Sequence, residues 1–324
     1  MQQPAAESGL RLPGAKVLKK SRQDRKANLQ LFTLTLPAII LVLIFSYLPM
    51  VGVILAFKQY RYDKGIFGSK WVGLKNFEFL FQSEDAFRIF RNTILYAFTN
   101  LCLGTLVAVF LAVLMNEIVS RKAIKYYQTT LFFPYFMSWV IVGYLVYTML
   151  DPYTGVANGM IEWLGGEPIE WYREPKYWPY ILVLTNLWKG LGFGALFYYA
   201  AIIGIDPHLN EAARIDGASR WQIARFVTVP SIMPTVMIFV ILGIGGLLNG
   251  DFGLHWFVPN MAANQAFLLS TTDNIDTYLY RSLYSSPNLG MQTAVGLFRS
   301  LVGIILIVTA NYLARKVNED HSIW

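Results

Sequence analysis

The chain has 324 residues, of which 55% are hydrophobic and only 15% are charged. A soluble domain carries about 25% charged residues, and the deficit here accompanies apolar runs of roughly twenty residues, which are typical of membrane spans. The composition excludes soluble, disordered and disulfide-rich classes, and one cysteine with three histidines offers no metal-binding spacing. The net charge of +7 is attributed to basic cytoplasmic loops rather than to a nucleic-acid partner.

The first thirty residues form a basic polar tail, which we expect in the cytoplasm. The apolar run that follows it is about twice the length of the ~7–15-residue core of a secretory signal. We therefore expect a first membrane span here rather than a cleaved signal peptide.

Six apolar segments predict an all-α membrane protein with about six transmembrane helices, because each is close to the ~20 residues that cross a bilayer. They cover residues 31–57, 94–114, 130–150, 181–203, 232–248 and 293–312. The transmembrane domain is expected over residues 31–315, followed by a short tail at 316–324.

Loop charges predict that both termini are cytoplasmic. The 118–128 loop is basic and the 151–179 loop is mainly acidic, as cytoplasmic and external loops should be. The 58–91 loop is the exception, since it must be external although it carries seven basic residues against four acidic ones. This topology places residues 204–231 in the cytoplasm.

The 204–231 loop has the local signals of a helix pair. Asp206 and Pro207 predict a capped helix start, and Gly217 predicts its end, because glycine adopts positive φ without strain. Ser219 and Gln222 have the spacing of a capping box that begins a second short helix. We expect Pro230 to mark the start of the fifth span.

The first of these helices should offer a slim, charged surface to another protein. Ala212, Ala213 and Ala218 permit close approach, and Glu211 and Asp216 place charge at either end. Glu211 is also spaced to pair with Arg214. An ordinary solvated connection is the alternative, while a DNA-binding helix-turn-helix is disfavoured because the loop is tethered to spans and has few basic residues.

The run EAARIDGASRWQIARFVTVP closely resembles the EAA motif of permease subunits in binding-protein-dependent ABC importers. The matching residues are Glu211, Ala212, Ala213, Asp216, Gly217, Ala218, Phe226 and Pro230, and Arg214 lies among them. The resemblance implies the type I importer permease fold. It also implies that this loop is a coupling helix that docks on an ATP-hydrolysing subunit.

Other segments are similar to the oligo- and polysaccharide branch of that family, permeases of alginate import included. They are WVGLKNFEFLF (71–81), FRNTILY (90–96), IDTYLYRSLY (275–284), the last apolar segment and the final HSIW. The resemblance implies a multi-pass protein of the bacterial cytoplasmic membrane. The implied partners are a second homologous permease, an ATPase dimer, an external solute-binding protein and a carbohydrate substrate.

The chain has no phosphate-binding loop of the G-x-x-x-x-G-K-[ST] type. We therefore expect a transport subunit without cofactor or catalytic residues, with ATP and Mg²⁺ bound by partner subunits. The alternatives are a permease for a non-sugar solute or a membrane-embedded enzyme of polysaccharide or lipid metabolism, although paired carboxylates for the latter are not evident.

Candidate substrate contacts lie on the fourth span, where aromatic and polar side chains suit a sugar. They are Asn186, Trp188, Lys189, Phe193 and Tyr198. A charge inside a span is costly, so Lys189 indicates either a pathway residue or a cation that snorkels or pairs with a partner subunit. Arg299 in the sixth span raises the same question.

Overall fold

The computed structural model describes residues 22–261, 265–285, 288–319 and 322–324. Most of the predicted basic tail lies outside these residues. The chain forms two units, residues 1–53 and 54–324, and each is described by itself.

The first unit is helical throughout its described part. It contains α1 (Arg22–Val42), the π-helical turn η1 (Leu43–Tyr47) and the start of the 3-10 helix η2 (Leu48–Phe57). The stretch Gln30–Phe57 has the length and composition of a membrane span, as the first apolar segment predicts.

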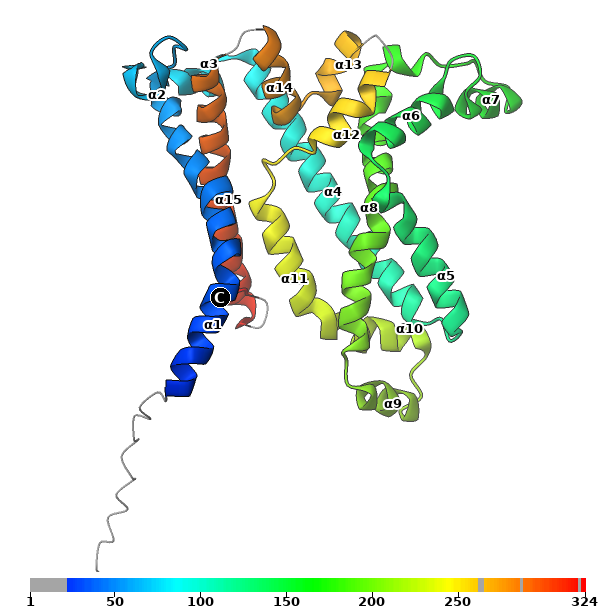
Figure 1. Ribbon diagram of the computed structural model, residues 1–324. Coiled ribbons are helices and arrows are strands. Elements are labelled where there is room, and N and C mark those ends of the chain that lie inside the picture. The colour runs from blue at the N-terminus through cyan, green and yellow to red at the C-terminus, as the bar shows by residue number, and fades with distance from the viewer. Residues whose placement is uncertain (1–21, 262–264, 286–287, 320–321) are drawn as a thin grey trace, which may run out of the picture. The chain divides into compact units, whose positions relative to one another are not determined.

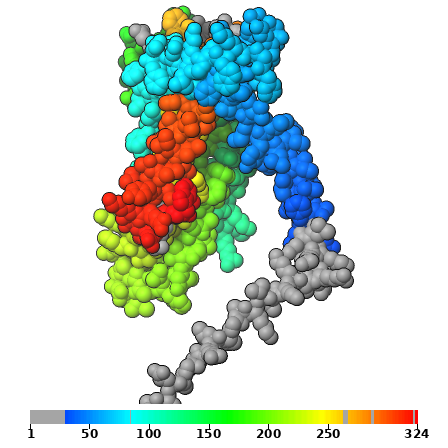
Figure 2. All heavy atoms as spheres, turned by 90° about the vertical axis from the view of Figure 1, so that its left-hand side faces the viewer, coloured from blue at the N-terminus to red at the C-terminus, as the bar shows by residue number. Residues whose placement is uncertain are grey.

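The second unit begins with a small two-stranded sheet and short helices. These are β1 (Lys58–Gln59), α2 (Gly65–Gly68), β2 (Lys70–Trp71), η3 (Lys75–Phe77) and α3 (Glu78–Gln82). The strands are antiparallel, with Lys58 opposite Trp71. Figure 2 shows this region, in blue to cyan, directly above the orange start of α15 (Leu289–Val317).

Long helices form the body of this unit (Figure 1). They are α4 (Glu84–Asn116), α5 (Arg121–Phe132), α6 (Trp139–Leu150), α8 (Trp178–Ile203), α11 (Val229–Gly245) and α15. With the first unit, the described residues contain five helices that could each cross a membrane, or six if the bent pair of α5 and α6 counts as one span. The predicted all-α membrane fold is confirmed.

The third apolar segment is not one straight span as predicted. The 3-10 turn η4 (Phe133–Phe136) separates α5 from α6, and the two parts meet at 98°. Pro134 cannot donate a backbone hydrogen bond, and Met137 and Ser138 are extended, so the α-helix stops. Ser138 then caps α6 by accepting from the N–H of Ile141.

Two predicted span boundaries are also wrong, because polar helical turns extend beyond the apolar runs. The second span belongs to a helix of 33 residues that begins at Glu84 instead of residue 94. In the fifth, α11 begins at Val229 with Pro230 in its first turn, as predicted. It follows α10 and the π-helical turn η7 (Ala224–Thr228) without a break, so the helical run extends from Arg220 to Gly245.

Helices α4 and α8 pack along each other through small residues, including Ala108, Ala112 and Ala195, which are almost fully buried. Gly192 brings α8 against α5, because a Cβ at that position would collide with the main-chain carbonyl of Leu131. Close backbone contacts of this kind determine how the spans pack, because apolar side chains interact about as well with lipid as with another helix.

Short helices close one end of the unit, near the starts of α4 and α15 (Figure 1). We call α12 (Phe252–Phe257), α13 (Gln265–Thr272) and α14 (Ile275–Ser285) the cap. Asp273, whose side chain is fully buried, pairs with Arg281 at 2.7 Å and accepts a hydrogen bond from Thr277. Asn92 of α4 donates to the Asp273 carbonyl at 2.9 Å, so the cap is tied to the membrane helices by polar contacts.

The remaining short elements connect these helices. They are α7 (Val156–Trp163), η5 (Trp171–Arg173), η6 (Pro175–Tyr177), α9 (Pro207–Ile215), α10 (Arg220–Ile223) and η8 (Pro259–Met261).

Candidate functional site

The predicted helix pair of residues 204–231 is present, with the expected start and turn. Asp206 accepts a hydrogen bond from the N–H of His208 at 3.0 Å, and Pro207 occupies the first helical turn of α9. Gly217 has φ +81°, a conformation that a residue with a side chain adopts only with strain. The turn between α9 and α10 therefore depends on a glycine at this position.

The capping box at the start of α10 is also confirmed. The Ser219 hydroxyl accepts from the N–H of Gln222, and the Gln222 side chain accepts from the N–H of Ser219 at 2.7 Å. One predicted contact is wrong. The Glu211 carboxylate lies 3.5 Å from the Nδ1 of His208, and the described residues show no ion pair between Glu211 and Arg214. Both pairings use the same helical spacing, and His208 lies on the N-terminal side, toward which helical side chains lean.

Helix α9 projects beyond the ends of α8 and α11, at the opposite end from the cap (Figure 1). It has no buried residue, and Leu209, Ile215 and Trp221 of this loop expose 50%, 86% and 65% of their surface. Ala212 is also exposed, while Ala213 and Ala218 are half-buried. Large apolar side chains concentrated on a projecting polar loop are typical of a surface that another protein covers.

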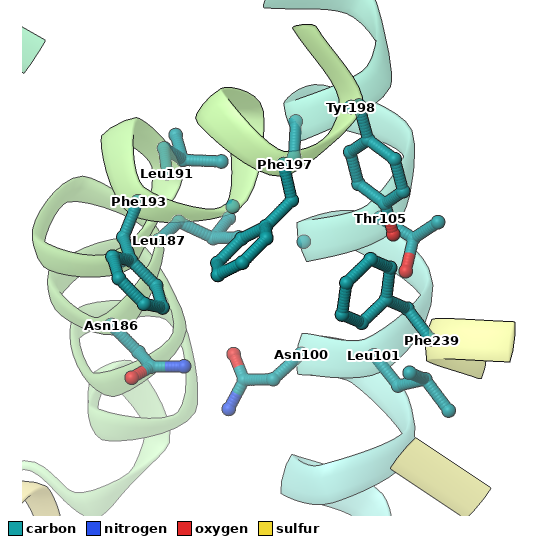
Figure 3. Close-up of a pocket in the computed structure, with 14 residues that line it drawn as sticks. Asn100, Leu101, Thr105, Asn186, Leu187, Leu191, Phe193, Phe197, Tyr198 and Phe239 are labelled. Atoms are coloured by element: carbon teal, nitrogen blue, oxygen red, sulfur yellow. The ribbon is translucent and has the colours of Figure 1, made fainter. Parts of the chain in front are cut away.

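A second candidate site is a cavity of about 340 Å³ between α4, α8 and α11. Three of the predicted pathway residues line it, namely Asn186, Phe193 and Tyr198. Asn100 and Asn186 point toward each other from α4 and α8, and the ring of Phe197 lies above them (Figure 3). The cavity combines aromatic rings with amide groups, as a sugar site requires.

Two further residues of this cavity come from helices whose proximity to α8 is not predicted by the sequence. Thr105 of α4 lies beside Tyr198, and Phe239 of α11 contributes a ring (Figure 3). Asn100 and Phe239 lie in apolar runs far from residue 186, and neither belongs to a motif.

A smaller polar cavity of about 190 Å³ adjoins the first, since Asn100 and Asn186 line both. Its other walls include Asp251, His255 and Asn274 from the cap region. The Oδ1 of Asn100 and the Nδ2 of Asn274 are buried and have no hydrogen-bond partner among the described residues. These two atoms therefore retain hydrogen-bonding capacity for a polar ligand.

Two titratable groups that the segment around α12 contributes to this cavity have shifted pKa values. Desolvation by the surrounding protein raises the pKa of the Asp251 carboxyl above its usual range, although the side chain is open to the cavity. Complete burial lowers the pKa of His255 to about 4, against a hydrogen bond to the Thr272 carbonyl that raises it. The Nδ1 of His255 lies 2.9 Å from that carbonyl, so Nδ1 carries the proton of a neutral ring.

The other two predicted pathway residues lie elsewhere on α8. Trp188 is 47% exposed and does not line either cavity. Lys189 donates a 2.8 Å hydrogen bond to the main-chain carbonyl of Tyr135, and its Nζ lies about 5 Å from the ring centroids of Tyr135 and Trp139. The cation is thus held at the break in the third span.

Arg299 has a carboxylate partner within this chain. It pairs with Asp276 of the cap, and it donates to the Asn249 Oδ1 at 2.8 Å. The arginine therefore links α15, α14 and the turn that follows α11.

The family described as "Binding-protein-dependent transport system inner membrane component" matches residues 104–319, more than half of the chain. The chain belongs to this family. With its long apolar helices, it is a multi-pass membrane protein and a transport subunit, as the sequence predicts.

Relatives cover nearly the whole chain. Protein LplB of Bacillus subtilis is 37% identical over 91% of both chains, and the polygalacturonan/rhamnogalacturonan transport system permease protein YteP of the same organism is 36% identical over 90% of this chain and 89% of its own. A crystal structure of a bacterial ABC transporter involved in the import of the acidic polysaccharide alginate contains a chain that superposes with a TM-score of 0.81. That chain is 35% identical, and the match covers 91% of this protein and 98% of that chain. The type I permease fold is thereby confirmed.

Proposed function

We propose that this protein is the translocation subunit of an ATP-driven importer of an anionic oligo- or polysaccharide in a bacterial cytoplasmic membrane. It receives cargo from an external solute-binding protein and works with a second homologous permease and an ATPase dimer. ATP and Mg²⁺ bind to the ATPase subunits, and this chain holds no cofactor. Both of its termini and residues 204–231 face the cytoplasm.

The observation that carries the proposal is the projecting α9–Gly217–α10 loop. Its two caps and its glycine fix the shape, while Leu209, Ile215 and Trp221 are left open for a partner. Because α10 continues through η7 into α11, a displacement of the loop is passed directly to a membrane helix. The loop extending from Glu211 to Pro230 is therefore the coupling element between ATP hydrolysis and the spans.

The cargo follows from the two adjoining cavities and from the relatives. Aromatic rings such as Phe193 and Phe197 suit the C–H faces of sugar rings, and the free amide atoms of Asn100 and Asn274 suit hydroxyl groups. YteP is described as a polygalacturonan/rhamnogalacturonan permease, and the superposed structure belongs to an alginate importer that was also crystallised with an alginate-pentasaccharide-bound periplasmic protein. The polysaccharides named for these two transport systems are both acidic.

The coupling role is tested with Gly217→Pro and Glu211→Lys in the assembled transporter. We expect both variants to insert normally and to keep ATP hydrolysis by the partner, while uptake falls at least tenfold. Gly204→Ala is the matched control, because Gly204 ends α8 with an ordinary φ of −77°. Unchanged uptake in both variants would contradict the coupling assignment.

The cargo is tested by measuring ATPase stimulation with binding protein loaded with either an oligouronate or a neutral oligosaccharide of equal length. We expect stronger stimulation by the oligouronate. Equal or stronger stimulation by the neutral sugar would overturn the anionic assignment and leave the transport role intact.

A further inference from the structure

A third groove, of about 660 Å³, lies between α4 and α8 and is separate from the two proposed pathway cavities, sharing only Leu187 with the larger and Tyr96 with the smaller. Its long walls are apolar, with Leu95 and Leu103 on α4 facing Val183 and Leu184 on α8. Leu95 and Leu184 expose 56% and 66% of their surface. The groove therefore opens at the membrane-embedded surface of the two helices.

The charged and most polar part of the groove is the end near the cap, and Thr99 is a further polar residue along its wall. Arg91 and Asn92 both donate to the Ser270 carbonyl, at 3.1 and 3.2 Å, and Thr271 completes this wall. Tyr180 lies on the α8 side and is 71% exposed. An arginine and a tyrosine above apolar side chains mark the level of the membrane–water interface.

The charge of Arg91 has no carboxylate partner among the residues that the structure describes. Its guanidinium donates to the Asn92 side chain and the Ser270 carbonyl, and no carboxylate lies within 4.0 Å of it among the described residues. Arg88, one turn earlier, pairs instead with Asp85 at 2.7 Å and lies 3.7 Å from Asp273. The groove thus has a free cation at its polar end.

The length of the groove matches one leaflet of a bilayer. From Arg91 to Leu103 α4 advances twelve residues, which is roughly 18 Å at 1.5 Å per residue. Half of a hydrocarbon core of ~30 Å is about 15 Å. A chain that begins at Arg91 and follows the groove would therefore end near the centre of the membrane.

We propose that this groove binds an anionic phospholipid, with its phosphate at Arg91 and one acyl chain between α4 and α8. The arginine at one end and the leaflet-length apolar walls favour a lipid, whose phosphate and acyl chain match both features, over an apolar transmembrane helix of a second subunit.

The headgroup is tested by native mass spectrometry of the full chain, purified with its partner subunits from nanodiscs. The discs contain equal amounts of phosphatidylglycerol and phosphatidylcholine with the same acyl chains. We expect preferential retention of phosphatidylglycerol and a loss of about fivefold in Arg91→Gln, which equals about 1 kcal/mol for one basic contact. Glutamine can still donate to the Ser270 carbonyl, so the fold is retained.

Arg173→Gln is the control, since Arg173 lies outside the groove and pairs with Glu170 at 3.0 Å. It should retain as much phosphatidylglycerol as the unaltered protein. Equal retention of the two lipids, or equal losses in both variants, would overturn the assignment of the headgroup to Arg91. Displacement of the lipid by excess inorganic phosphate would show that only the anion is bound, and would overturn the acyl-chain assignment.

The acyl chain is tested by filling the groove. Leu103→Trp should reduce retention of both lipids severalfold, whereas Leu106→Trp should not, because Leu106 is 67% exposed on the same helix but does not line the groove. A photoreactive benzophenone side chain at Leu184 should form an adduct with lipid. A cross-link to the second permease subunit in place of lipid would overturn the proposal.

Discussion

The ammonium group of Lys189 on α8 is bonded to the main-chain carbonyl of Tyr135, where the third apolar segment turns by 98°. A broken helix leaves carbonyl groups without an N–H partner, and such groups are costly in the membrane. Lys189 satisfies one of them, and the rings of Tyr135 and Trp139 flank its charge. The cation therefore stabilises the break, and it does not line the cavities that contain Asn186 and Phe193.

Lys189→Met should lower the free energy of unfolding by about 1–3 kcal/mol, because it leaves the Tyr135 carbonyl without a donor. The measurement is denaturation of the purified protein in detergent. Lys189→Gln, which keeps a donor but not the charge, should recover part of the loss. A Lys189→Met variant as stable as the unaltered protein would contradict the structural role. Normal uptake of every substrate by the same variant would count against a role of Lys189 in the substrate pathway.

Gly192→Ala should disrupt the contact between α8 and α5, since its Cβ would meet the Leu131 carbonyl. Backbone atoms cannot move aside as a side chain can, so we expect a loss of about 1–3 kcal/mol and less monodisperse protein. Gly190→Ala is the matched control on the same helix, where a Cβ would meet open space. Similar behaviour of the two variants in size-exclusion chromatography would argue against the close approach.

The stability of the cap should depend on pH through His255. Its folded pKa of about 4 lies below the ordinary histidine value of 6.5, so the unfolded chain binds the proton more readily. His255 therefore favours folding fully above about pH 6.5, and this contribution falls as the pH decreases toward 4. Comparing Tm for the unaltered protein and His255→Gln across this range should show a smaller decrease in the variant. Parallel curves would be inconsistent with a buried neutral ring.

The ion pair between Arg299 and Asp276 should hold the cap to α15. Asp276→Asn leaves a partly buried arginine without its carboxylate, so we expect a loss of about 1–3 kcal/mol, measured as faster hydrogen exchange in α14 and the start of α15. The exchanged pair, Asp276→Arg with Arg299→Asp, should restore part of this protection. A double variant that behaves as the sum of its single variants would indicate that the two residues do not interact.

The loop of residues 204–231 shows how far local signals reach. Asp206, Gly217 and Ser219 act on backbone groups within three residues of themselves, so their sequence positions predicted α9, its turn and the capping box. The partner of Glu211 could not be predicted in this way, because His208 and Arg214 are both one helical turn away. The direction in which the side chains lean favours His208.

The spans were predicted by their apolar lengths, but their ends and their straightness were not. Polar residues such as Asp85 and Arg88 extend α4 beyond the apolar run, since a helix leaving the membrane continues as long as its backbone bonds are satisfied. Pro134 was a visible signal for the break in the third span. Pro234 lies within α11 without a comparable break, so a proline alone does not predict a bend.

The sequence by itself determined that this protein is an all-α membrane permease with a short helix pair between its fourth and fifth spans. Hydropathy, helix caps and the EAA pattern are each contained in a short stretch of chain, so they can be identified from the sequence. Only the tertiary structure decided which side chains share a cavity. It brought Asn100, Phe239 and Asp251 to Asn186, and it bonded Lys189 to the break at Tyr135, outside the lining of both cavities. The physical reason is that helix rotation and close packing through residues such as Gly192 select the inward face, and these depend on contacts between distant segments.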